Sequence, residues 1–266
     1  MRPLASLDAN EARALDGLLF DLDDTVLSHG LLTRAAFGAI WDLHDAGLKL
    51  VAVTGRPSAW GEVVARQWPI DGAVTENGSV HVVRDGKGVR LIFDGPALEV
   101  EARRKKLDAL VARVAREMPH VKLADDNDGR RADVAWDVGE RVKLPENDVA
   151  VLGRIVVEEG ARTTRSSVHL HATYERDDKA SGVVRFLHSR FGVDVGAALH
   201  RYAFAGDSGN DAACFSAFRT TFGVANVKAF VDKLSVPPRY VASKERGEGF
   251  AEIARAILSV RTTTPR

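Results

Sequence analysis

The sequence is poor in cysteine: Cys214 is the single one among 266 residues. One cysteine cannot form an internal disulfide bond, which favours a reducing compartment, and we expect a cytoplasmic protein. Cys214 itself is expected to be a small apolar residue on a helix.

An excess of one charge is also missing, because 37 Lys and Arg residues balance 37 Asp and Glu residues. No net positive field therefore favours nucleic acid or an anionic membrane as a partner. No apolar run approaches the ~18 residues of a membrane-spanning helix, and the N-terminus lacks the apolar stretch of a signal peptide. The length exceeds the ~100–200 residues usual for one domain, so one large or two smaller domains are expected.

The first part of the chain alternates strand and helix patterns. Short apolar runs at 17–23 and 48–54 predict buried strands. Between them, 33–47 predicts a helix with Thr33 as N-cap and Gly47 as C-cap. A second helix is expected from an N-cap at Ser58 to about Trp68, before Pro69. Strand–helix–strand order with short connections implies parallel strands.

The middle of the chain changes character. Residues 79–93 form two strand-like runs around "DGKG", which predicts a hairpin. Two units of helix–strand–strand follow, and their elements are expected at 96–118, 121–125, 131–138, 146–159, 161–165 and 167–174. This order is typical of a compact α+β unit that forms its own layer.

The last third returns to alternation. Helices are expected at 179–191, 210–217 and 248–260, strands at 201–207, 221–226 and 239–243, and a frayed end at 261–266. The fold class is therefore α/β, a Rossmann-like parallel-sheet core with an inserted α+β unit. We expect the core at 1–93 and 175–266 and the insert, or cap, at 94–174.

Polar residues follow three of the predicted core strands: "DLDDT" after the first, "VTGR" around 53–56, and "GDSGND" at 206–211. Open parallel sheets bind ligands at the carboxyl ends of their strands. If these strands are neighbours, Asp21, Asp23, Thr54, Asp207 and Asp211 gather at one edge.

Several carboxylates in one pocket need a cation, and oxygen ligands suit a hard ion such as Mg²⁺. A carboxylate can also attack phosphorus to give an aspartyl-phosphate. The phosphoryl transition state needs donors and positive charge around its oxygens. Thr54 offers a hydroxyl, and Lys179 begins a helix whose N-terminus favours an anion.

In this order, "DLDDT", "VTGR", the lysine of "DKASGVVRFL" and "GDSGND" resemble the four motifs of the haloacid dehalogenase (HAD) superfamily. An α+β insert between the second and third motifs resembles the cap of its IIB, or Cof-type, branch, which includes sugar phosphatases. "TENGS" at 75–79 and the stretch 239–257 are also similar to that branch. In the cap, the element order alone matches, in its short form of two helices and four strands.

The resemblance implies a Mg²⁺-dependent phosphatase that hydrolyses a small phosphorylated metabolite, a sugar phosphate, through an aspartyl-phosphate. Asp21 is the implied nucleophile and Asp23 the general acid/base. The implied metal ligands are Asp21, the backbone carbonyl of Asp23, and Asp207, with Asp211 in support. Thr54, Gly55, Lys179 and Asn210 are the implied phosphate-binding residues. Asp24 is read as a turn residue.

Other features have plainer readings. His169 and His171 share a strand face, which permits a metal pair, but no third ligand is evident; a cap contact with substrate or a structural role remains open. "DDNDG" at 125–129 fails as a calcium loop, because Ala124 and Ala135 stand where carboxylates are required, and it predicts a turn. "EARRKK" at 101–106 predicts a solvated helix face, with docking of an anionic substrate as the alternative.

Three other functions compete with the phosphatase. A phosphomannomutase-like member of the same branch returns the phosphoryl group to a sugar. A phospho-acceptor signalling module also uses Asp, Thr and Lys around Mg²⁺, but it is about half as long and lacks both a cap and the second Asp. A dehalogenase is disfavoured because its chemistry does not need the metal site. Neither the substrate nor the oligomeric state can be read from the sequence.

Overall fold

Two main β-sheets and a short two-stranded one, β3 (Leu27–Ser28) with β4 (Leu31–Leu32), organise the chain in the computed structural model, which describes residues 1–166 and 168–261. Within these residues the larger sheet has nine strands. Their spatial order is β1 (Arg2–Pro3), β14 (Tyr240–Val241), β13 (Thr220–Gly223), β12 (Tyr202–Gly206), β2 (Gly17–Phe20), β5 (Lys49–Val53), β6 (Gly72–Thr75), β7 (Val80–Asp85) and β8 (Gly88–Ile92). The strands from β1 to β6 pair in parallel, and the β6–β7–β8 end is antiparallel.

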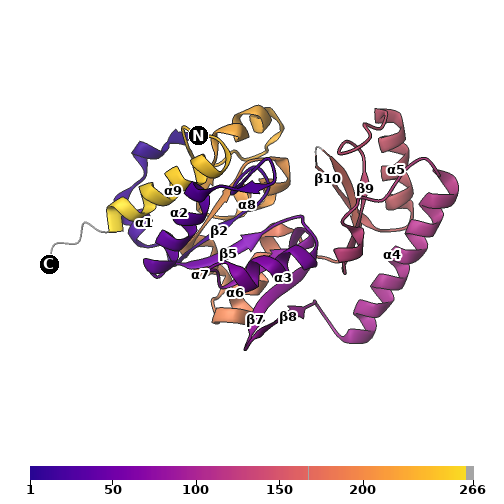
Figure 1. Ribbon diagram of the computed structural model, residues 1–266, viewed down its shortest axis with the longest axis horizontal. Coiled ribbons are helices and arrows are strands. Elements are labelled where there is room, and N and C mark those ends of the chain that lie inside the picture. The colour runs from indigo at the N-terminus through magenta and orange to yellow at the C-terminus, as the bar shows by residue number, and fades with distance from the viewer. Residues whose placement is uncertain (167, 262–266) are drawn as a thin grey trace.

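Helices cover both faces of this sheet (Figure 1). One face packs against α2 (Arg34–Asp45), α3 (Ser58–Gln67) and α9 (Arg246–Arg261), and the other against α6 (Lys179–Phe191), α7 (Val195–Arg201) and α8 (Ala212–Ala217). The short α1 (Ala9–Arg13) lies beside α9.

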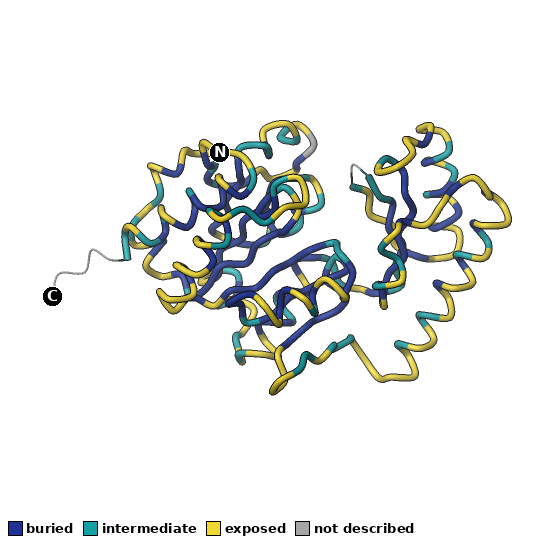
Figure 2. Tube along the Cα trace, in the orientation of Figure 1, coloured by how far each residue is buried: buried dark blue, intermediate teal, exposed yellow. Residues whose placement is uncertain are grey.

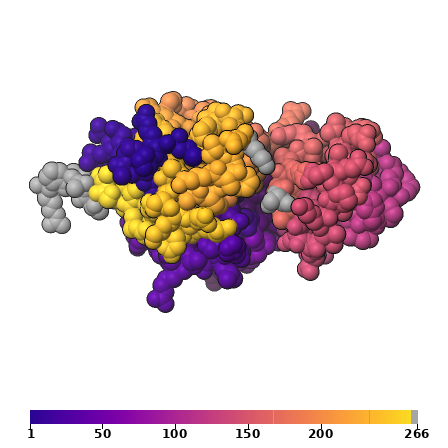
Figure 3. All heavy atoms as spheres, turned by 90° about the horizontal axis from the view of Figure 1, so that it is seen from above, coloured from indigo at the N-terminus to yellow at the C-terminus, as the bar shows by residue number. Residues whose placement is uncertain are grey.

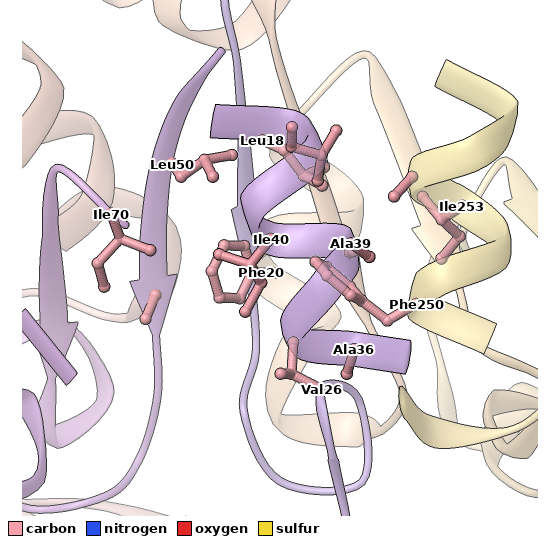
Figure 4. Packing of buried hydrophobic residues seen from close by; sticks show 14 of the residues in the cluster. Leu18, Phe20, Val26, Ala36, Ala39, Ile40, Leu50, Ile70, Phe250 and Ile253 are labelled. Atoms are coloured by element: carbon pink, nitrogen blue, oxygen red, sulfur yellow. The ribbon is translucent and has the colours of Figure 1, made fainter. Parts of the chain in front are cut away.

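Strand β2 shows why its apolar run is buried on both sides. Successive side chains of a strand point to opposite faces. Leu18 and Phe20 therefore pack with Ile40 of α2 and Phe250 of α9 (Figure 4), whereas Leu19 joins the cluster on the opposite face. All of these side chains are fully buried. The predicted parallel α/β core is confirmed.

The second sheet lies to one side of the core, with order β10 (Arg162–Arg165), β11 (His169–Thr173) and β9 (Asp133–Asp137). One of its faces is apolar and packs on α4 (Ala97–Glu117) and α5 (Glu146–Glu158). Buried strands are visible in both parts in Figure 2, so each part has its own interior. Seen from above, the two parts form separate lobes (Figure 3). We call them the core and the cap; the exact limits at 93/94 and 174/175 stay a prediction.

Among its described residues, the cap has one strand fewer than expected. Residues 121–125 form an isolated bridge, Leu123 to Trp136, instead of a strand. The side chain of Asn127 takes the place of further pairing, since it donates to the Ala124 and Ala135 carbonyls and accepts from the Ala135 N–H. The "DDNDG" stretch is indeed a turn, with a 3₁₀ segment η3 at Asn127–Gly129.

Two helix caps were also predicted one residue off. Pro57 is the N-cap of α3, and Ser58 is its first residue because its hydroxyl donates to the Gly129 carbonyl in the cap instead. The C-cap of α2 is Ala46, and Gly47 follows it with a φ of +80°. Thr33 does cap α2, since its hydroxyl accepts from the Ala36 N–H.

The N-terminal β1 and α1 were not predicted, because two-residue strands and one-turn helices leave no periodic pattern. Of the predicted frayed end at 261–266, Arg261 is instead the last residue of α9, and 262–266 lie outside the described residues. Among the helices that are described, none is long and apolar enough to cross a membrane.

Candidate active site

Three strand ends meet at one edge of the large sheet. Strand β2 lies between β12 and β5, all three run parallel, and Phe20 pairs with both Ala205 and Ala52. Residues that follow these strands therefore emerge side by side. The chain places Asp21 after β2, Thr54 after β5 and Asp207 after β12, as the sequence predicted.

Lys179 joins this edge from α6. Its ammonium donates to Asp21 Oδ1 at 2.7 Å and to Asp211 Oδ1 at 2.8 Å, and the lysine is 2% exposed. Burial lowers the pKa of Lys179, but the two carboxylates raise it more, so the net shift is upward. The ammonium is therefore held charged between two carboxylates.

Two glycines, Gly78 and Gly182, allow α6 to approach the "TENGS" turn closely. Gly78 has a φ of +111°, and a Cβ there would meet the Asp178 carbonyl at 2.0 Å. A Cβ on Gly182 would meet the backbone of Gly78 at 2.4 to 2.8 Å. The "TENGS" turn thus packs directly against the N-terminus of α6, where the side chain of Asp178 caps the helix by accepting from the Ser181 N–H.

Asp21, Asp207 and Asp211 form a buried acidic triad, whose ligand oxygens lie within 4.8 Å of one another. Burial raises the pKa of Asp21 well above its usual range; Lys179 opposes this rise, and Asp211 and Asp207 add to it. Burial, then repulsion from Asp211, raises the pKa of Asp207 to about 7. One ammonium is thus too little positive charge for three buried carboxylates.

The triad fits a hard divalent cation. Its donors are all oxygens, which Mg²⁺ prefers, and a dication would supply the missing positive charge. Asp211 differs from the other two members, because its Oδ2 already accepts from the N–H groups of Asp207 and Ser208. The supporting role expected for Asp211 at the metal stays a prediction.

Asp23 lies outside the triad and is half-exposed. Arg56 donates three hydrogen bonds to it, from Nη2 to Oδ1 at 2.6 Å and from Nε to Oδ1 at 3.0 Å and Oδ2 at 2.9 Å. The guanidinium also stacks over Trp60, 4.0 Å from the ring centroid. Asp23 is therefore oriented by a cation that is itself held in place.

Asp24 has a φ of +56°, which confirms the turn. Its carboxylate pairs with Arg246 at 2.8 Å, and its carbonyl accepts from Asn226. The same Asn226 amide donates to Asp207 Oδ2 at 2.8 Å. This turn therefore ties the loop after β2 to the loop after β12.

The candidate phosphate-binding residues also lie here. The Thr54 hydroxyl accepts from the Arg56 N–H, which leaves its hydrogen free to donate. The Thr54 carbonyl accepts from the Asn77 N–H, so the "VTGR" loop is bonded to the "TENGS" turn. Asn210 accepts from the Ser208 hydroxyl through its amide oxygen, and its NH₂ group is the donor side.

Comparison with known proteins gives structural matches only. No family model and no curated protein sequence matches the chain. The solved structure of Thermoplasma acidophilum 0175 matches with a TM-score of 0.71 and 19% identity, over 92% of this chain and 98% of that one. The sucrose-phosphatase of Synechocystis sp. PCC6803, solved with sucrose and phosphate, matches with a TM-score of 0.66 and 17% identity, over 91% and 98%.

A HAD subclass IIB sugar phosphatase, BT4131, matches with a TM-score of 0.60 and 19% identity, over 92% of this chain and 99% of that one. The fold is that of the HAD superfamily phosphatases. Coverage above 90% includes most of the cap as well as the core. The structural likeness therefore extends to the inserted unit. In the sequence, only the order of elements in this unit resembled the cap of the branch.

In this fold, a cavity of about 360 Å³ lies between the cap sheet and the edge of the core where Lys179 and Asn210 lie. Lys179 and Asn210 line it from the core, and Arg162, Thr164 and His171 line it from the cap. The strand register explains these cap residues, because Thr164 pairs with His171 and Arg162 with Thr173. They belong to the face of the cap sheet opposite to α4 and α5, which we call the polar cap face.

The two histidines have separate partners. His169 contacts Glu140 at 2.9 Å, and His171 contacts Asp133 at 3.0 Å. No third ligand gathers with them among the described residues, so a metal pair finds no support. His171 lines the cavity, which keeps its role as a substrate contact open.

The remaining sequence features are structural. Cys214 is fully buried on α8, as expected. On α4, Arg104 pairs with Asp108 and Lys105 with Glu101, as on a solvated helix face. Arg103 differs, because it binds Glu175 in the chain segment that returns from the cap.

Sequence reasoning missed Arg56, Glu76, Arg130, Asn226 and Arg246. Arg56 stands inside the recognised "VTGR" motif, so the motif itself was the available signal. Glu76 and Arg246 also stand inside recognised stretches, "TENGS" and 239–257. Asn226 binds Asp24 and Arg130 binds Gly55, both far away in sequence, and no local pattern could reveal these two contacts.

Proposed function

We propose that this protein is a Mg²⁺-dependent phosphatase that hydrolyses a small sugar phosphate through an aspartyl-phosphate on Asp21. The observation that carries the proposal is the buried contact of Lys179 with Asp21 and Asp211, next to Asp207 and at the cavity. This contact combines a nucleophile, a cation and a metal-ligand set at one point. The fold that the chain shares with HAD phosphatases supports the reaction class.

In the first step, a carboxylate oxygen of Asp21 attacks phosphorus, and the bond from phosphorus to the leaving oxygen breaks. Asp23 donates a proton to that oxygen, so the alcohol leaves neutral. Thr54, Lys179, Asn210 and the Gly55 backbone hold the phosphoryl oxygens. Bound Mg²⁺, with Asp21, Asp207, Asp211 and the Asp23 carbonyl as its proposed protein ligands, supplies charge neutralisation at these oxygens.

In the second step, Asp23 takes a proton from water, whose oxygen attacks phosphorus and breaks its bond to Asp21. Free Asp21 and inorganic phosphate result. The hydrogen bonds from Arg56 fit both steps, because they hold the Asp23 carboxyl group in one orientation while it donates and accepts a proton.

The polar cap face supports a sugar as the leaving group. Its side chains offer several donors and acceptors toward the cavity, which suit hydroxyl groups better than an apolar ring. Two structural neighbours are a sucrose-phosphatase and a sugar phosphatase, in agreement with this choice. Because Cys214 is a free cysteine, we further propose that the protein is cytoplasmic. We also propose that it has no nucleic-acid or membrane partner.

A phosphotransferase that returns the phosphoryl group to a sugar remains the alternative. It shares the first step and differs in whether water or a sugar accepts the phosphoryl group. A signalling module is disfavoured, because the cap belongs to the structural match.

The test is a panel of phosphorylated metabolites with Mg²⁺, read by release of inorganic phosphate. Hydrolysis of a sugar phosphate without a bisphosphate activator supports the phosphatase. Asp21→Asn serves as the inactive control, and its folding is checked by its melting temperature. Release of phosphate only when a bisphosphate is present would instead indicate the phosphotransferase.

A further inference from the structure

Glu76 is a fully buried carboxylate at the boundary between core and cap. It follows β6 in the "TENGS" turn, with a φ of +51°. The catalytic steps above do not use it. A left-handed backbone and a buried charge are both costly at one position, so a specific role is indicated.

The Glu76 carboxylate accepts four backbone N–H groups from two parts of the chain. Oε1 accepts from Ser58 in the core at 2.9 Å. Three successive N–H groups of the cap, those of Arg131, Ala132 and Asp133, donate at 3.0, 2.6 and 3.0 Å. One side chain of the core thus holds the segment that leads into the cap strand β9.

Two cap residues just before this segment, Arg130 and Gly129, also bind the core. Arg130 donates from Nη1 to the Gly55 carbonyl at 3.1 Å, and the Gly129 carbonyl accepts from the Ser58 hydroxyl. A Cβ on Gly129 would meet Ala59 at 3.0 Å, so the two lobes touch closely here. The docked segment therefore reaches the loop that carries Thr54 and Arg56.

The buried Glu76 carboxylate depends on the N–H groups that donate to it. Burial, and then repulsion from Asp133, raise the pKa of Glu76 to about 7, while the N–H donors of Ala132 and Ser58 oppose the rise. The donors from the cap are present only while the cap is docked. A Glu76 side chain without them must be hydrated, which requires that the two lobes separate.

We propose that Glu76 is a positioning residue for the reaction: it docks the segment 130–133 so that the polar cap face lies over Lys179 and Asn210. This inference rests on the proposed function, because it assigns the cap the task of holding the leaving group. Substrates that need the cap should depend on Glu76, and substrates too small to reach the cap should not.

The test compares wild type with Glu76→Gln and Glu76→Ala, using a hexose 6-phosphate and p-nitrophenyl phosphate. Glutamine keeps the size of the side chain but turns an NH₂ group toward N–H donors, so it cannot accept all four hydrogen bonds. We expect kcat/KM for the hexose phosphate to fall by about 10- to 100-fold, as misplaced binding groups do. With the aryl phosphate it should stay near wild type.

Glu11→Gln is the matched control. Glu11 is also a nearly buried carboxylate, with Tyr240, Thr220 and Arg239 as partners, but it lies at the opposite edge of the sheet. This variant should lower the melting temperature without separating the two substrates. A loss confined to the hexose phosphate in the Glu76 variants, and absent in Glu11→Gln, supports positioning over general destabilisation.

Small-angle scattering gives a readout that does not depend on activity. The Glu76 variants should show a larger radius of gyration than wild type and Glu11→Gln, because the cap is no longer held. Unchanged scattering, or an equal loss with both substrates, would overturn the inference. If wild type hydrolyses no phosphate ester, the proposed function fails, and the scattering still decides whether Glu76 docks the cap.

Discussion

Arg56 donates three hydrogen bonds of 2.6 to 3.0 Å to Asp23 while its guanidinium stacks on Trp60. Asp23 is half-exposed, whereas Asp21 is buried beside Lys179. Two carboxylates only two residues apart thus lie in opposite surroundings. The buried one suits a nucleophile that must shed water, and the exposed one suits a group that exchanges protons.

The first prediction concerns the contact of Arg56 with Asp23. Arg56→Met should lower kcat for a hexose phosphate by roughly tenfold or more, part of the ~10²–10⁴-fold that acid/base assistance provides. The loss should be smaller with an aryl phosphate, whose leaving group needs little protonation. Trp60→Leu is the control, since it removes the stacking and leaves the ion pair. Steady-state kinetics with both substrates check this, and an equal loss for both would argue against an orienting role.

The second prediction concerns the acidic triad. EDTA should abolish phosphate release, and Mg²⁺ should restore it. Mg²⁺ should also raise the melting temperature of wild type, because a ligand that binds only the folded state stabilises it by about 2.7 kcal/mol at 100 times Kd. Asp207→Asn should show little of this shift. Full activity after thorough chelation, or the same shift in both proteins, would refute the metal site.

The third prediction concerns pH and His81. This side chain is fully buried on β7, packs edge-to-face on Phe186 at 5.4 Å, and has no well-formed hydrogen bond to its ring nitrogens among the described residues. Burial, with repulsion from Arg185, lowers the pKa of His81 to about 3, which the Gly182 backbone opposes only in part.

Because the folded pKa lies below the unfolded value of ~6.5, the unfolded chain binds the proton more tightly between these values. Stability should therefore fall as pH drops below ~6.5, by about 2 kcal/mol at pH 5 from this residue alone. His81→Phe keeps the ring and should lose this dependence. Urea unfolding of both proteins at pH 5 and 7.5 measures it; parallel losses would show that His81 does not titrate on unfolding.

The sequence was sufficient for the parallel core because its strands are short apolar runs that end in polar motifs. Asp21, Thr54, Lys179 and Asp207 each lie at a strand end or helix start, so topology alone brings them together. The predicted first residue of α6, Lys179, agrees with the structure. Local patterns of this kind need no knowledge of distant partners.

The cap was harder to predict because its polar contacts are made across long sequence distances. Glu76 binds backbone N–H groups more than fifty residues away, and any sequence offers such groups. The strand expected at 121–125 failed for a similar reason, since the Asn127 side chain replaced backbone pairing. Which hydroxyl groups the polar cap face recognises depends on geometry between lobes, which a linear pattern does not encode.

The central claim is that Asp21 becomes phosphorylated and Asp23 completes the reaction. In Asp23→Asn, an aryl phosphate should still phosphorylate Asp21, because its leaving group departs without a proton, but hydrolysis of the intermediate should slow by about 10²–10⁴-fold. The aspartyl-phosphate should therefore accumulate. The decisive measurement is rapid-quench labelling of Asp23→Asn with a radiolabelled aryl phosphate, followed by peptide mapping. The account predicts one labelled peptide that contains Asp21, and none in the Asp21→Asn, Asp23→Asn double variant. Label on another residue, or equal slowing of both steps for aryl and sugar substrates, would contradict it.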